Sequence, residues 1–291
     1  EPNLISTSFI PLKISNLPQD LKGFKILQFS DLHLTHATSN SFLEKITKKI
    51  QSLKPDLIVF TGDFISYGQL DDQQKLQNFL NSLKAPYGCY AILGNHDYDG
   101  SVSVNENGDY DVIASSAPLA KAFKRIFTST TLTKTITERA KAIPLHRELL
   151  NTLQKTPFKL LHNSTEFIKV KNSGLNICGL GEYMLGRSHP ETAFQLYNQK
   201  FPGIILAHNP DSAPLLSSYP GEIILSGHSH GGQVNLPWLW KKFTLLENMN
   251  FKKGLHRIKE KWMYVNRGIG GVLPFRWFSP PELTLITLEA T

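Results

Sequence analysis

Short apolar runs that end directly in polar clusters recur along this chain, and they restrict its fold more than any other feature. Residues 222–225 lead into Gly-His-Ser-His-Gly-Gly, and residues 57–60 lead into Thr-Gly-Asp. An apolar run of four residues before a glycine turn is typical of a buried strand. The glycines let the backbone pass close to a bound group. Taken alone, the histidine-rich turn could also be a solvated loop.

The spacing of apolar residues between these runs predicts helices. Residues 24–30 and 57–60 read as strands, and Phe42, Ile46 and Ile50 lie on one helical face between them. A strand, a helix and a second strand predict parallel neighbours, and the pattern repeats up to a strand at residues 89–93. We therefore expect an α/β fold with a site beyond the carboxyl ends of the strands. Residues 167–170 and 175–178 predict an antiparallel pair with a turn at Gly174.

The polar clusters at the predicted strand ends contain two carboxylates, one amide and four imidazoles. These are Asp31, His33, Asp63, Asn95, His208, His228 and His230. The set is too large for one metal ion and suits two ions that share a carboxylate, an arrangement that stabilises phosphoryl displacement. Carboxylate and imidazole together favour Mn, Fe, Zn or Co over Ca or Mg.

The composition narrows the class of partner. The net charge of +7 over 291 residues predicts an anionic partner, which could be a phosphorylated substrate, a membrane surface or nucleic acid. No nucleic-acid motif favours the last of these. Cys89 and Cys178 lie in apolar, strand-like runs and read as buried thiols, with a bridge between them left open. No apolar run is long enough to span a bilayer. The chain starts at Glu1, so we expect that a signal or anchor segment was removed upstream.

Two stretches depart from the alternating pattern. Residues 99–111 are rich in glycine and asparagine and predict a mobile loop, whereas residues 119–147 predict one or two basic amphipathic helices, with a solvated helical face as the alternative. We expect residues 99–146 to form a helical lid inserted in a single domain of residues 1–291. Its candidate substrate-binding residues are Lys121, Phe123, Lys124 and Arg125. Tryptophans interleaved with Lys and Arg over residues 238–277 fit either a membrane-interface belt or a core with a basic surface.

The ordered motifs Asp-x-His, Gly-Asp, Gly-Asn-His-Asp, a lone His after an apolar strand, and Gly-His-x-His resemble the calcineurin-like metallophosphoesterase superfamily. The resemblance covers about residues 22–98 and 150–291. It implies a four-layered β-sandwich flanked by helices. It also implies one metal ion at Asp31, His33, Asp63 and His230, and a second at Asp63, Asn95, His208 and His228. His96 would contact the phosphate or protonate the leaving oxygen, Asp97 would orient His96, and Gly62 and Gly94 would leave room for substrate.

Finer motifs resemble the membrane-associated bacterial branch of this superfamily. These motifs are Ala-His-Asn-Pro-Asp at 207–211, Gly-His-Ser-His-Gly-Gly-Gln at 227–233 and Pro-Pro-Glu-Leu at 280–283. The branch includes chlamydial-type enzymes that cleave the pyrophosphate of UDP-2,3-diacylglucosamine in lipid A synthesis. The resemblance implies a Mn-dependent hydrolase of a lipid-linked substrate on the cytoplasmic face of the inner membrane. The alternatives are a phosphodiesterase, phosphatase or nuclease of soluble substrates, and a scaffold protein without activity.

Overall fold

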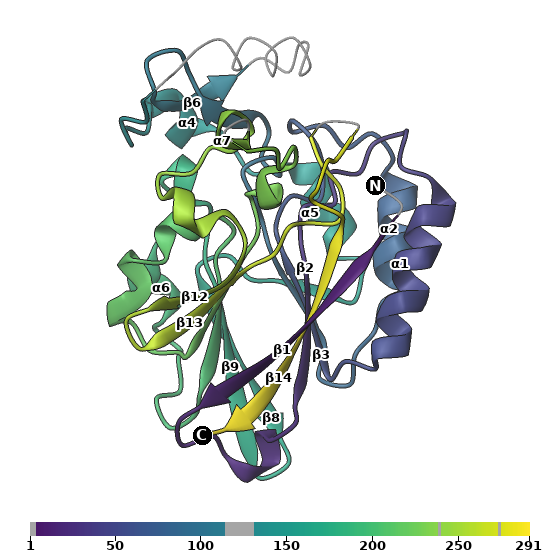
Figure 1. The fold of residues 1–291 in the computed structure, drawn as a ribbon, viewed down its shortest axis with the longest axis vertical. Helices are drawn as coiled ribbons and strands as arrows, with labels where there is room; N and C mark the ends of the chain where they lie inside the picture. The colour runs from purple at the N-terminus through teal and green to yellow at the C-terminus, as the bar shows by residue number, and fades with distance from the viewer. Residues whose placement is uncertain (1–3, 114–130, 238–239, 273–274) are drawn as a thin grey trace.

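The computed structural model describes residues 4–113, 131–237, 240–272 and 275–291, and it arranges them as two stacked sheets with helices on both outer faces (Figure 1). Within these residues each large sheet has six strands. One apolar cluster, with Ile26 and Val59 from the first sheet and Ile177 and Ile204 from the second, fills the space between the sheets. The expected four-layered sandwich is confirmed.

The first sheet has the order β1-β14-β2-β3-β4-β7. Its strands are Ser6–Ile14 (β1), Glu282–Ala290 (β14), Lys25–Phe29 (β2), Leu57–Thr61 (β3), Cys89–Ile92 (β4) and Phe158–Leu160 (β7). Strands β2, β3, β4 and β7 run parallel, as the strand–helix–strand pattern predicted, and β14 is antiparallel to β2. The carboxyl ends of β2, β3 and β4 therefore lie along one edge.

Helices cover the outer face of this sheet (Figure 1). They are Asn40–Leu53 (α1), Gln73–Asn81 (α2) and Arg147–Leu153 (α5). Their apolar faces, including Ile46, Leu76 and Leu149, pack with Phe29 and Phe60 of the sheet in one cluster. The side chain of Ser39 caps α1 by accepting a hydrogen bond from the N–H of Phe42.

The second sheet has the order β12-β13-β11-β10-β9-β8. Its strands are Gly254–Ile258 (β12), Lys261–Val265 (β13), Ile223–Ser226 (β11), Gly203–Leu206 (β10), Ser173–Gly179 (β9) and Ser164–Val170 (β8). Strands β9, β10, β11 and β13 run parallel, and the edge strands β8 and β12 are antiparallel to their neighbours. Helix α6 (Pro190–Ala193) contributes Ala193 to the apolar cluster on the outer face.

The turn between β8 and β9 lies earlier than predicted. Val170 pairs with Ser173, so Lys171 and Asn172 form the turn, and Lys171 takes a left-handed backbone with φ 53°. Gly174 lies inside β9, where a Cβ would collide with the ring of Phe167. A glycine is needed at this position because the ring of Phe167 lies so close, and not because the chain turns there. Cys89 and Cys178, in β4 and β9, are free, buried thiols.

The segment after β4 also differs from the expectation. Residues 99–111 are not a plain loop, because Ser101–Val104 (β5) and Tyr110–Ile113 (β6) form an antiparallel hairpin. Helix α4 (Glu138–Ala142) follows within the described part of the predicted helical stretch. Helix α7 comprises Trp240–Phe243. Among the described residues, no helix has the length and apolar character needed to cross a bilayer.

Candidate metal centre

The seven predicted ligands meet where strands of both sheets end. Asp31 and His33 follow β2, Asp63 follows β3, and Asn95 comes shortly after β4. The second sheet supplies His208 after β10 and both His228 and His230 after β11. All seven side chains are buried except that of His228, which is half-buried. The tertiary fold thus gathers residues from five strand ends into one site.

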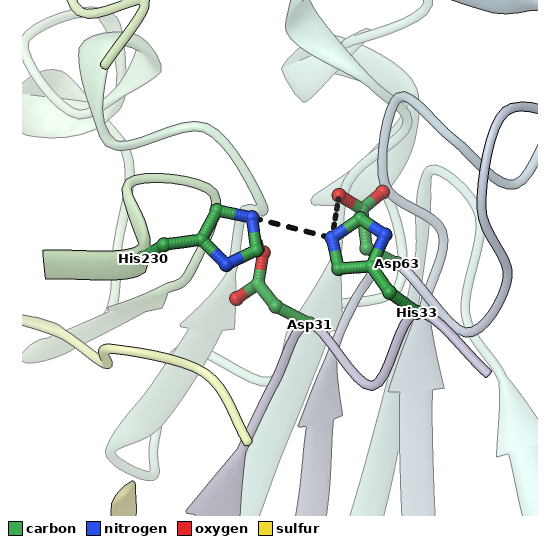
Figure 2. Close-up of side chains that lie close together, drawn as sticks. All are labelled: Asp31, His33, Asp63 and His230. Carbon is green, nitrogen blue, oxygen red and sulfur yellow. Dashed lines mark hydrogen bonds and ion pairs between the residues drawn. The ribbon is translucent and has the colours of Figure 1, made fainter. Parts of the chain in front are cut away.

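Four of these side chains form a compact group, shown in Figure 2: Asp31, His33, Asp63 and His230. One potential ligand atom from each lies within 4.8 Å of all the others. Nε2 of His33 is 3.2 Å from Nε2 of His230 and 3.3 Å from Oδ2 of Asp63. Nε2 of His230 is 3.6 Å from Oδ1 of Asp31. The donors of four residues therefore converge on one small volume.

The remaining predicted ligands lie on the other side of Asp63. Nε2 of His208 is 3.3 Å from Oδ2 of Asp63, the same oxygen that His33 approaches. Nδ1 of His228 is 2.9 Å from Oδ1 of Asn95, and the rings of His208 and His228 are 5.2 Å apart. One carboxylate oxygen thus faces an imidazole from each of the two predicted ligand sets.

The chemistry of these donors fits divalent cations. Burial lowers the pKa of His33 and of His228 to about 3, so both imidazoles are neutral and offer a lone pair at pH 7. Burial raises the pKa of Asp31 to about 7, a shift that a bound cation would reverse. Nε2 of His228 is buried without a hydrogen-bond partner among the described residues. Buried polar atoms without partners are costly, and metal coordination removes that cost.

Neighbouring polar groups turn the donor atoms inward. Nδ1 of His208 donates to the carbonyl oxygen of Thr61 over 2.7 Å, which leaves its Nε2 as the donor of a lone pair. Oγ of Ser66 lies 3.3 Å from Nδ1 of His33. The amide nitrogen of Asn95 donates to the carbonyl oxygen of Val102 in β5 over 3.0 Å, so its amide oxygen faces the site. The hairpin after β4 therefore helps to orient a predicted ligand.

The backbone at the site is strained. Five of the seven predicted ligands have positive φ: Asp31 (52°), His33 (46°), Asp63 (63°), His228 (68°) and His230 (52°). A left-handed conformation costs a non-glycine residue roughly 1–2 kcal/mol. Such strain concentrates at functional sites, where surrounding contacts hold it in place.

The two glycines that were expected to leave room for substrate lie directly against predicted ligands. A Cβ at Gly62 would fall 2.5 Å from Nδ1 of His208, and a Cβ at Gly94 would collide with the carboxylate of Asp63. The backbone of each glycine thus packs directly against a predicted ligand. A side chain at either position would displace that ligand.

His96 and Asp97 lie beside the predicted metal ligands, and their side chains make different contacts. Nδ1 of His96 accepts from the backbone N–H of Tyr67 over 3.0 Å, and its ring is 4.8 Å from that of His33. The carboxylate of Asp97 accepts from the backbone N–H groups of Asp63, Ile65 and Gly94 over 2.8, 3.1 and 3.0 Å. The expectation that Asp97 orients His96 is therefore wrong. Asp97 positions the loops that carry Asp63 and Asn95, and the Tyr67 backbone orients His96.

Arg276 is a residue that the sequence reasoning missed. Its side chain is buried, and its guanidinium donates to the carbonyl oxygens of His230 (3.1 Å), Ser279 (2.7 Å) and Gly268 (3.3 Å). Ser279 adds a hydroxyl donor to the same oxygen of His230 over 2.7 Å. No residue pattern marks Arg276, because its partners are backbone atoms. The predicted substrate residues Lys121, Phe123, Lys124 and Arg125 lie outside the described residues.

One protein-family model and several known proteins match this chain. The calcineurin-like phosphoesterase family model matches residues 24–232. The chain is 41% identical to the UDP-2,3-diacylglucosamine pyrophosphatase LpxG of Chlamydia muridarum, over 98% of this chain and 90% of that protein. The LpxG of Chlamydia trachomatis serovar D matches with the same identity and coverage. The phosphodiesterase YaeI of Escherichia coli is 26% identical over 91% of this chain and 82% of its own length.

Proposed function

Because the chain belongs to the calcineurin-like phosphoesterase family, we propose that it is a metal-dependent hydrolase that cleaves the pyrophosphate of UDP-2,3-diacylglucosamine. Water adds across the phosphoanhydride bond and gives UMP and 2,3-diacylglucosamine 1-phosphate. The observation that carries the proposal is the 41% identity to two LpxG proteins over 98% of this chain. The buried Asp and His cluster supports the metal-dependent chemistry.

The proposed site holds two divalent ions. Asp31, His33 and His230 bind one with Asp63, and Asn95, His208 and His228 bind the other with the same carboxylate. The position of Oδ2 of Asp63, 3.3 Å from Nε2 of both His33 and His208, supports this sharing. A bound metal pair lowers the pKa of water and stabilises charge on the attacking and leaving oxygens. Mn²⁺ is the proposed ion, and Fe, Zn and Co suit the same donors.

His96 is the proposed catalytic residue of the chain itself. Because its Nδ1 accepts from Tyr67, the neutral ring carries its proton on Nε2. That N–H can donate a hydrogen bond to a phosphate oxygen, and this is the role that we propose for it, because a neutral imidazole is too weak an acid to protonate the leaving oxygen. Asp97 acts as a positioning residue, since its carboxylate holds the backbone of Asp63 and Gly94.

We propose that the enzyme works at a membrane surface, on the cytoplasmic face of the bacterial inner membrane. The acylated substrate and the net charge of +7 support this location. Residues 99–146 are the proposed lid, and Lys121, Phe123, Lys124 and Arg125 are its proposed substrate-binding residues. Glu247 ties the described part of this segment to the body of the protein. It accepts from the hydroxyls of Tyr110 (3.0 Å) and Tyr183 (3.1 Å) and pairs with Lys134 (2.9 Å).

Activity of the purified, Mn-loaded protein tests the proposal directly. UDP-2,3-diacylglucosamine should be cleaved to UMP, and at a higher kcat/KM than bis-p-nitrophenyl phosphate or single-stranded DNA. An enzyme that prefers the diester or the DNA would instead be a phosphodiesterase or nuclease of soluble substrates. An Asp63→Ala variant controls for contaminating hydrolases.

A further inference from the structure

A cavity of about 550 Å³ opens beside the predicted ligand His33, and the metal centre does not account for it. Ser66 and Tyr67 line it together with His33. The ring of Tyr67 is 5.1 Å from that of His96, so this end of the cavity borders the proposed catalytic residue. The volume lies within the range of sites that bind small molecules.

One part of the cavity wall is apolar, and the neutral polar side chains of Thr35, Thr38, Ser39 and Gln69 line another. The apolar lining residues are Leu32, Ala37, Phe42, Ile269, Val272 and Phe275. Phe275 is 37% exposed, and its ring lies 5.8 Å from that of Trp277, which is 54% exposed. Phe278, next in the chain, is 64% exposed. The apolar wall therefore continues into exposed aromatic side chains of the kind that lie at membrane interfaces.

The charges around the cavity argue against an anionic occupant. Among the described lining residues, the carboxylate of Asp71 would repel a phosphate. The guanidinium of Arg276 also lines the cavity, but it donates to the carbonyl oxygens of His230, Gly268 and Ser279. No lysine is present in the described lining. The phosphates of a substrate thus find their partners at the metal centre, and the cavity suits an uncharged, apolar part of the same molecule.

We propose that this cavity binds an acyl chain of the lipid-linked substrate. The diphosphate lies at the metal centre beside His33, and the chain runs past Val272 towards Phe275 and Trp277. The inference rests on the proposed function, because a diphosphate held at the metals brings an attached acyl chain to the inner end of the cavity. The described body of the protein then binds an acyl chain, and this role does not fall to residues 99–146 alone.

Inhibition by alkyl phosphates tests the cavity without the lipid substrate. Decyl phosphate, below its micelle concentration, and ethyl phosphate are compared as inhibitors of bis-p-nitrophenyl phosphate hydrolysis by the Mn-loaded enzyme. We expect decyl phosphate to inhibit at least tenfold more strongly, because its chain enters the cavity. Phe275→Ser and Val272→Asp should reduce this advantage to less than threefold.

A matched control variant distinguishes the loss of a cavity contact from the general effect of replacing an exposed phenylalanine. Phe167 in β8 is 38% exposed, close to the 37% of Phe275, and it contacts Phe201 outside the cavity. Phe167→Ser should keep both the basal activity and the full advantage of decyl phosphate. Circular dichroism and metal content verify that each variant is folded. Since Phe275 is partly exposed, its variant provides a test even if Val272→Asp does not fold.

The outcomes distinguish this inference from the proposed function. If both variants keep the advantage of decyl phosphate, the cavity does not bind an acyl chain, whatever the enzyme cleaves. If the variants instead weaken inhibition by UMP, the cavity binds the nucleoside and the inference is overturned. If the chain-length effect depends on Val272 and Phe275 but UDP-2,3-diacylglucosamine is not cleaved, the cavity assignment stands and the proposed substrate is wrong.

Discussion

The backbone N–H of Tyr67 donates a hydrogen bond to Nδ1 of His96 over 3.0 Å. This contact fixes both the orientation and the tautomer of the ring. Burial lowers the pKa of His96, so the ring is neutral at pH 7 and carries its proton on Nε2. A donor held in this way needs no rearrangement before it meets a phosphate oxygen.

His96→Ala should therefore lose activity without losing metal. We expect kcat to fall by roughly 10²–10³-fold, the usual loss when one fixed hydrogen-bond donor to the transition state is removed. Metal content and melting temperature should stay near those of the native protein, because His96 belongs to neither proposed ligand set. Steady-state kinetics and elemental analysis of the same sample measure both. A parallel fall in metal content and activity would make His96 a ligand.

Asp63→Ala should lose both metal ions and all measurable activity. The reason is that Oδ2 of Asp63 lies 3.3 Å from Nε2 of His33 and of His208, one from each proposed ligand set. Elemental analysis after dialysis gives the stoichiometry, and Glu44→Ala on α1 serves as a carboxylate control. Retention of one tightly bound ion would show that the two sites do not share Asp63.

Arg276→Met should destabilise the protein and weaken metal binding together. The guanidinium donates to the backbone carbonyls of Ser279, Gly270 and Arg267, and each buried carbonyl left unpaired costs about 1–3 kcal/mol. The carbonyl of His230 loses one of its donors and keeps the Ser279 hydroxyl. We expect the free energy of unfolding to fall by at least about 3 kcal/mol by the same reasoning. Urea unfolding and a metal titration measure the two effects.

Two further variants check the role assigned to Arg276. Arg276→Lys should be intermediate, because one ammonium group cannot reach all the carbonyls. Arg257→Met removes a half-exposed arginine whose guanidinium lies over the ring of Trp262, and it should cost less than about 1 kcal/mol. If Arg276→Met unfolds and binds metal like the native protein, the carbonyl contacts do not hold His230 in place.

Phe123→Asp tests the proposed lid. If residues 99–146 bind the acyl chains, turnover of UDP-2,3-diacylglucosamine should fall at least tenfold, which corresponds to a loss of about 1.4 kcal/mol in transition-state stabilisation. Turnover of a soluble diester should stay unchanged. Leu196→Asp changes an exposed leucine elsewhere and should affect neither substrate. Equal losses on both substrates after Phe123→Asp would assign this segment a structural role.

The buried cysteines should make stability depend on alkaline pH. Burial raises the pKa of Cys89 to about 11 and that of Cys178 to about 12, whereas an unfolded thiol titrates near pH 9. Above pH 9 the unfolded chain loses these protons first, so stability falls as the pH rises. The slope should reach about 1.4 kcal/mol per pH unit for each cysteine.

Urea unfolding between pH 8 and pH 11 measures this slope. Cys178→Ala should reduce the slope of the free energy of unfolding against pH by about the contribution of one cysteine. Both thiols of the native protein should also react slowly with a thiol reagent at pH 8 and rapidly in denaturant. An unchanged slope in the variant, or fast labelling of the native protein, would contradict the effect of burial.

Local patterns were enough to predict the parallel strands and the polar clusters at their ends, whereas the expectation of a sandwich came from the family resemblance. Apolar runs before Asp31, Asp63 and His208 predict buried strands whatever packs around them, and parallel strands place their carboxyl ends at a common edge. The same patterns gave a wrong prediction for residues 99–111, where a loop was expected and the structure has a β-hairpin. The two strands of that hairpin have four residues each, too short for their alternation to outweigh the glycine and asparagine around them.

What the sequence by itself determined was which residues meet at the candidate metal centre, because a strand end and its polar cluster are adjacent in the chain. Only the tertiary structure decided how those residues are held. His230 relies on Arg276, which lies 46 residues away, and His96 relies on Tyr67, which lies 29 residues away. In each pair a backbone atom is one of the partners. Every residue carries the same backbone donors and acceptors, so no side-chain pattern in the sequence marks such contacts.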